Sequence, residues 1–189
     1  MAEKINQRVS VTKRLLKESL IEILSKKTIR KVTVTELCLR AGINRSTFYA
    51  HYRIPSDILT EIKKDFSAAL AESSRPKNQK GFSYEKLKDI CRFIYDNRSL
   101  QKIILLNSSD DEVLEAALES SIEIWGPEKD IDYLRRTDRD SAVLIRSFYY
   151  YGIYHLLREW TIHDVDKTPE EVARIIYKIL TDSAERDAF

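Results

Sequence analysis

The segment 44–52 combines hydrogen-bonding and aromatic side chains that can contact a nucleic acid. Arginine donates two hydrogen bonds to a guanine edge and also binds phosphate, and Arg45 could do either. Short hydroxyl side chains let a helix approach closely, donate to phosphate or touch a thymine methyl group. Such a mixture differs from the Glu/Lys face of a solvated helix. The side chains concerned are Arg45, Ser46, Thr47, Tyr49 and His51.

Signals for helix ends place these side chains on a short helix. Thr33 and Glu36 form a T-x-x-E capping box, in which the hydroxyl accepts a backbone N–H and the carboxylate reaches back to the cap. Gly42 stands where a helix must end in a left-handed conformation, and Asn44 is a strong N-cap. The pattern predicts two short helices around a turn, the second over 45–52. This is the helix-turn-helix pattern, whose second helix enters the major groove.

The turn and the second helix match a known family pattern at eight positions. These are Ala41, Gly42, Ile43, Thr47, Phe48, Tyr49, His51 and Tyr52. The segment 9–66 therefore resembles the DNA-binding domain of TetR-type transcriptional regulators, and the remainder resembles that family only as an all-helical regulatory domain. The resemblance implies that Tyr49 and His51 contact the phosphate backbone. Ile54 and Pro55 depart from the pattern, because many relatives carry lysine and polar residues there, so one common phosphate contact is expected to be missing.

Other residues of the segment have simpler roles. Thr33 can contact a phosphate through the helix N-terminus that it opens. Phe48 and Tyr52 are expected in the core, and for Tyr49 and His51 the alternative is packing without any DNA contact. The predicted DNA-binding residues are Thr33, Asn44, Arg45, Ser46, Thr47, Tyr49 and His51.

Charge is distributed unevenly along the 189 residues. Residues 1–65 carry 14 Lys/Arg against 7 Asp/Glu, a net of +7, whereas residues 66–189 carry 18 against 23, a net of −5. A basic N-terminal third joined to an acidic remainder is typical of a polyanion-binding domain on a non-binding one. The alternative is chance variation in surface charge, which the motif makes less attractive.

The whole chain predicts an all-α protein of about nine helices. Only four Gly and four Pro occur, which argues against a β-rich fold, and no internal repeat is visible. We expect a three-helix helix-turn-helix domain over 1–66 and a larger helical regulatory and dimerisation domain over 67–189. Outside the motif, apolar spacing and capping signals predict helices near 10–26, 55–72, 83–97, 100–106, 109–125, 140–160 and from 168 onward. The last of these opens with a capping box formed by Thr168 and Glu171, and residues 28–32 are expected to be a short link.

The helix near 140–160 carries aromatic residues around most of its circumference, so several of its sides must be covered. Family resemblance implies that the last two long helices form a symmetric four-helix dimer interface. Residues predicted for that interface are Tyr149, Gly152, Ile153, Trp160, Ile176 and Ile179. Residues predicted for an effector cavity are Phe93, Tyr95, Trp125, Tyr150 and Tyr154. The alternative for each aromatic is an ordinary place in the core.

Several other classes of protein find little support. Cys38 and Cys91 lack metal-ligand or disulfide-framework spacing, His155 and His163 are eight residues apart, and no glycine-rich phosphate loop occurs. We therefore expect no enzyme, no metal and no cofactor. No apolar run exceeds four residues and the N-terminus lacks a signal-peptide core, so we expect no membrane association and a cytoplasmic protein.

Two functions remain in view. The first is a homodimeric transcriptional repressor that binds a palindromic double-stranded operator and is released by a signal or small-molecule effector. The second is a TetR-like interaction module that acts through a partner protein, for example as a co-activator, without an effector.

Overall fold

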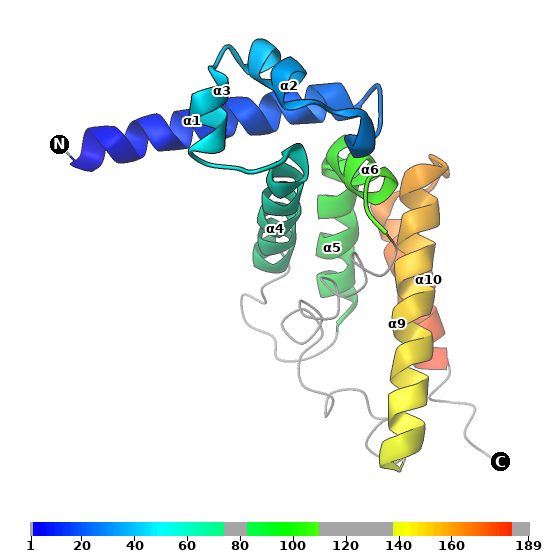
Figure 1. Ribbon diagram of the computed structural model, residues 1–189. Coiled ribbons are helices and arrows are strands. Elements are labelled where there is room, and N and C mark those ends of the chain that lie inside the picture. The colour runs from blue at the N-terminus through cyan, green and yellow to red at the C-terminus, as the bar shows by residue number, and fades with distance from the viewer. Residues whose placement is uncertain (1, 74–82, 110–137, 183–189) are drawn as a thin grey trace. The chain divides into compact units, whose positions relative to one another are not determined.

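The computed structural model describes residues 2–73, 83–109 and 138–182, and all the regular structure in these ranges is helical. The chain divides into two compact units. We call residues 1–66 with 106–108 the head, and residues 67–105 with 109–189 the body. Figure 1 labels the helices of both. Each unit is considered in turn.

The head contains α1 (Ala2–Leu24), the short 3-10 helix η1 (Ile29–Lys31), α2 (Val34–Ala41), α3 (Arg45–Tyr49) and the first part of α4 (Pro55–Ser73). Apolar residues at helical spacing give each helix one buried side. Fully buried side chains come from all four α-helices, and they are Leu16, Leu20, Leu37, Phe48 and Ile58. A single apolar core therefore fixes the position of α3.

The turn between α2 and α3 follows the local signals closely (Figure 1). The Thr33 hydroxyl accepts the N–H of Glu36 at 3.2 Å, which confirms the predicted cap. Gly42 ends α2 in the left-handed region at φ 65°, and the N–H of Ile43 donates to the carbonyl of Cys38 at 3.0 Å. These bonds satisfy backbone groups that a helix end otherwise leaves open.

A polar cluster ties the end of the motif to α1 and α4. The carboxylate of Glu61 accepts hydrogen bonds from Lys13 Nζ and from the Tyr52 hydroxyl, both at 2.9 Å, and pairs with Lys17 at 2.8 Å. Lys17 also reaches Asp65 at 2.6 Å. Burial alone would raise the pKa of Glu61, but the hydrogen bonds from Lys17, Lys13 and Tyr52 outweigh it and lower the pKa to about 2.

The body contains the end of α4, together with α5 (Tyr84–Asp96), α6 (Arg98–Leu106), α9 (Arg139–Ile162) and α10 (Pro169–Asp182). Helices α5 and α10 pack side by side. One apolar cluster holds α5, α9 and α10 together, and its buried members are Leu87, Ile90, Cys91, Ile94, Trp160, Val172, Ala173 and Ile176.

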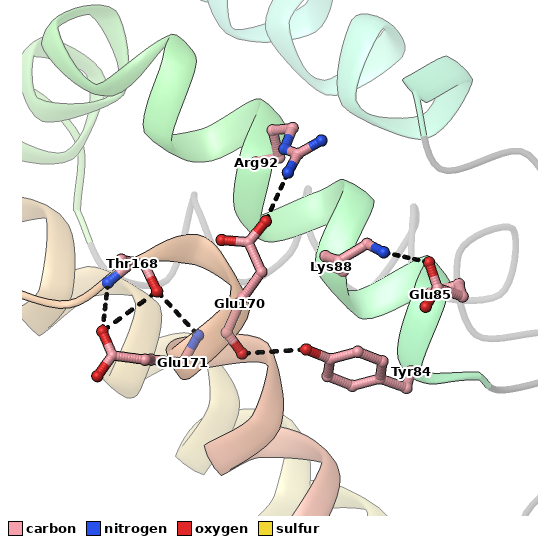
Figure 2. A network of polar contacts seen from close by, with 7 residues as sticks. All are labelled: Tyr84, Glu85, Lys88, Arg92, Thr168, Glu170 and Glu171. Carbon is pink, nitrogen blue, oxygen red and sulfur yellow. Dashed lines mark hydrogen bonds and ion pairs between the residues drawn. The ribbon is translucent and has the colours of Figure 1, made fainter.

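Polar contacts at the start of α10 fix its position along α5, as Figure 2 shows. Thr168 and Glu171 form a complete capping box, with the Thr168 N–H donating to the carboxylate at 2.9 Å and the Glu171 N–H donating to the hydroxyl at 3.2 Å. Arg92 pairs with Glu170 at 2.5 Å, and the Tyr84 hydroxyl donates to the Glu170 carbonyl at 3.3 Å. This capping box is the one predicted from the sequence.

The predicted helix bounds needed three corrections. Helix α1 begins at Ala2, not near residue 10, because a polar first turn can be helical without any apolar spacing. Helix α3 ends at Tyr49, not at Tyr52. The chain continues there in a tighter turn of the 3-10 type, in which the His51 N–H donates to the Phe48 carbonyl at 2.9 Å. The supposed link before α2 contains η1. The helix predicted over 109–125 lies almost wholly outside the described residues.

Two further findings concern the described residues alone. None of their helices is long and apolar enough to cross a membrane. Within the same ranges, no group of three or more histidine, cysteine, aspartate or glutamate residues is arranged to hold a metal ion.

Candidate nucleic-acid interface

Helix α3 has one buried side and one exposed side. Phe48 is fully buried, while Arg45, Ser46 and Tyr49 are exposed, with Tyr49 at 52%. The rings of Phe48 and Tyr49 meet edge to face with centroids 5.3 Å apart. The core residue thus supports the exposed tyrosine, and the polar side chains on the other side of the helix can reach a partner.

Arg45 and Tyr49 are one helical turn apart and interact. A hydrogen bond with the Tyr49 side chain raises the pKa of Arg45 above its usual value. Both residues are exposed, and their spacing of four places them on the same side of the helix.

The start of α2 is the other place where a phosphate contact was predicted. Thr33 is exposed and caps the helix. Lys27 donates to the Glu36 carboxylate at 2.5 Å, and this bond, assisted by the Thr33 backbone, lowers the pKa of Glu36. The N-terminus of α2 attracts negative charge, and the Glu36 carboxylate already supplies part of that charge.

Three of the residues predicted to bind DNA are less accessible than Arg45, or lack the hydrogen bond expected of them. Thr47 and His51 are half-buried. Asn44 occupies the N-cap position, but among the described residues its side chain makes no capping hydrogen bond, which corrects the expected role. Its amide is exposed instead, at the point where the chain enters α3. Phe48 and Tyr52 are buried as predicted.

Sequence reasoning missed the cluster around Glu61. Its signal was present, because Lys13 and Lys17 are spaced by four, as are Glu61 and Asp65. Two such pairs on facing helices can form a ladder of opposite charges. The partners are 48 residues apart, so their pairing cannot be assigned without the fold. The Tyr52 hydroxyl, which follows α3, also donates to Glu61.

The body aromatics divide among different environments. Phe93, Tyr150 and Tyr154 are half-buried, and burial raises the pKa of Tyr150. Tyr95 is 46% exposed and stacks on Trp160 at 6.0 Å. Trp125 lies outside the described residues. The predicted effector residues thus include one that faces outward from the body.

Residues predicted for dimerisation also divide. Trp160 and Ile176 are buried in the body core, and Ile153 packs against that core. These three side chains therefore contribute to the core of the single chain, below its surface. Tyr149 is half-buried, while Gly152 and Ile179 are exposed. Each of the two helices also has exposed apolar side chains, which we call its apolar stripe: Val143, Leu144, Phe148 and Tyr151 on α9, and Ile175 and Ile179 on α10.

A family model matches the body. Residues 83–182, more than half of the chain, match the TetR model described as the transcriptional regulator C-terminal region. The chain belongs to the TetR family of transcriptional regulators. Members of this family bind DNA and typically dimerise. The match lies in the body and does not include the helix-turn-helix residues. The head motif and the body of this TetR-family chain therefore indicate the same family independently.

Solved structures agree on the fold. A TetR transcriptional regulator from Streptococcus agalactiae 2603V is 22% identical, with 95% of this chain and 99% of that chain covered and a TM-score of 0.70. The dihydroxyacetone kinase operon activator DhaS is 15% identical, with 92% and 96% covered and a TM-score of 0.60. No curated protein matches the chain significantly. At these identities the likeness concerns the fold alone.

Proposed function

We propose that this TetR-family regulator is a homodimeric repressor that binds a two-fold-symmetric operator through α3 and is released by a small-molecule signal acting on the body. The observation that carries the proposal is that α3 has one buried side and one exposed side. Its buried Phe48 fixes the helix to the head core, and its exposed side presents Arg45, Ser46 and Tyr49. The head is also the basic part of the chain.

Affinity and specificity come from different groups in this proposal. Phosphate contacts supply most of the affinity, and Tyr49, His51 and the Thr33 end of α2 are assigned to them. Asn44, Ser46 and Thr47 enter the groove beside Arg45. Arg45 is assigned to a base edge, because its guanidinium can donate two parallel hydrogen bonds to guanine.

Dimerisation is assigned to the apolar stripes of α9 and α10. Phe148 is 73% exposed and follows Leu144 at a spacing of four, so the stripe runs along one side of α9. Exposed apolar surface of this kind marks protein interfaces. A dimer that binds two successive major grooves must hold its two recognition helices about 34–36 Å apart.

The signal is assigned to the half-buried aromatics Phe93, Tyr150 and Tyr154, together with the exposed Tyr95. A ligand changes DNA binding only when its affinity differs between two separations of the heads. The effector is therefore proposed to bind the separation that fits DNA poorly. The protein acts in the cytoplasm in this proposal, and its role is regulatory, not enzymatic.

Replacing Arg45 with alanine tests the base-reading role. We expect a loss of about 1–3 kcal/mol on the duplex that wild type selects, with relaxed preference at one base pair. Arg14→Ala is the matched control, because Arg14 is an exposed head arginine paired with Glu18 at 3.0 Å on α1. Equal ratios of specific to scrambled binding in wild type and Arg45→Ala would exclude Arg45 as a base reader.

A second candidate is activation, with or without a partner protein. It is favoured by the similarity in fold to a protein whose name describes it as an operon activator. Transcription from a selected site in a reconstituted system separates the two signs of regulation. A stable complex with another protein, with no response to small molecules, would favour the interaction module.

A further inference from the structure

The corner between α3 and α4 departs from the family pattern in a way that the structure explains. The Asp57 carboxylate accepts the backbone N–H of Arg53 at 2.8 Å and that of Ile54 at 3.2 Å. The first of these bonds is the main cause of a lowered pKa for Asp57. Pro55, at the first position of α4, has no N–H to offer. The start of α4 is therefore already occupied by an anion of the chain itself.

A cation lies at the same corner. Backbone bonds continue the turn after α3, with the Tyr52 N–H donating to the Phe48 carbonyl at 3.0 Å, and Arg53 follows directly. Arg53 comes four residues after Tyr49, which in turn comes four after Arg45. Its side chain is 92% exposed, far more than that of Lys17 or Arg40 in the same head.

The Asp57 carboxylate lies closer to the backbone N–H of Arg53 than to the Arg53 guanidinium. The distance from Arg53 Nε to Asp57 is 3.7 Å, whereas Arg40 reaches Glu22 at 2.7 Å. An exposed ion pair of this length contributes little stability. Asp57 thus fixes where the arginine leaves the chain and leaves the guanidinium in solvent.

We propose that Arg53 is a phosphate-binding residue of this protein, which replaces a contact at the start of α4 that Pro55 and Asp57 preclude. The inference rests on the proposed DNA-binding function and adds a residue to it. Arg53 then binds the backbone beside the groove that α3 enters, and contributes affinity without reading sequence.

The test compares Arg53→Gln, Arg53→Lys and Arg40→Gln in the full chain. The probes are the duplex that wild type enriches from a random pool and a scrambled duplex of the same length, over a series of salt concentrations. Arg40→Gln removes the same charge from the head at a paired position, so it controls for long-range attraction. Because the Arg53 side chain is exposed, its variants should fold, and circular dichroism checks this.

Arg53→Gln should weaken both duplexes by the same factor. One phosphate contact changes the salt slope by about 0.9, which corresponds to about fivefold per head at roughly 0.15 M salt. Arg53→Lys should keep most of the affinity, since the charge remains. Equal slopes and affinities for Arg53→Gln and Arg40→Gln would overturn the inference, as would a lysine variant as weak as the glutamine one.

Failure of the inference and failure of the proposed function give different results. If wild type enriches no duplex, the operator-binding proposal fails, and the scrambled duplex still tests the phosphate contact. If wild type binds a specific site while both glutamine variants behave alike, only the role of Arg53 is lost.

Discussion

Replacing Gly42 with alanine tests whether the turn between α2 and α3 depends on backbone conformation alone. Gly42 has φ 65° and ψ 31°, and a Cβ atom added there would meet nothing within 4 Å. No steric clash contributes, so the cost is that of a left-handed backbone, about 1–2 kcal/mol for a residue with a side chain. The population of the open head should rise roughly 5–30-fold.

Hydrogen exchange of the full chain is the suitable assay, because it resolves the head from the body. Amides of the buried α1 residues Leu16 and Leu20 should exchange faster by that factor in Gly42→Ala. Gly152→Ala is the matched control, since it adds the same methyl group in open space on α9 without a positive φ. Head amides should be unchanged by it. Unchanged exchange of the head amides in Gly42→Ala would refute the conformational argument.

Two other predictions concern titratable groups. The folded-state pKa of Glu61 is about 2, below its usual value of 4.5, so its contribution to stability is complete above about pH 4.5 and is lost as pH falls toward 2. Thermal melting of wild type and Glu61→Gln should therefore differ most near neutral pH and converge in acid; a constant difference would contradict the linkage. Burial raises the pKa of Cys91 to about 12, so its fully buried thiol should resist alkylation at pH 8 until the body unfolds. Rapid labelling of Cys91 in the native protein, measured by mass spectrometry with Cys91→Ala as control, would contradict the packing of α5 against α10.

The parts of the fold that were predictable depend on neighbouring residues. The capping boxes at Thr33 and Thr168 and the left-handed Gly42 each need only a few adjacent residues, and all three formed as expected. Buried Phe48 was also predictable, because the apolar positions of a short helix define one side.

Features that depend on distant residues were not accessible in the same way. Lys27 binds Glu36, and Lys17 binds Glu61 across α1 and α4, and no local rule selects these partners. In α9 the aromatics surround the helix, so periodicity could not separate buried Trp160 from exposed Phe148. The role of Arg53 was not predictable for a different reason, because its spacing in the sequence does not show that its side chain is 92% exposed.

Selection of duplexes from a random pool by the full-length protein, at fixed salt near 0.15 M, tests the central claim most directly. We expect enrichment of a two-fold-symmetric site with half-sites about 10 base pairs apart or a multiple of that spacing, and loss of one conserved base pair per half-site with Arg45→Ala. Enrichment of no sequence, with weak binding that falls steeply with salt, would contradict the account and leave the head as a general polyanion binder.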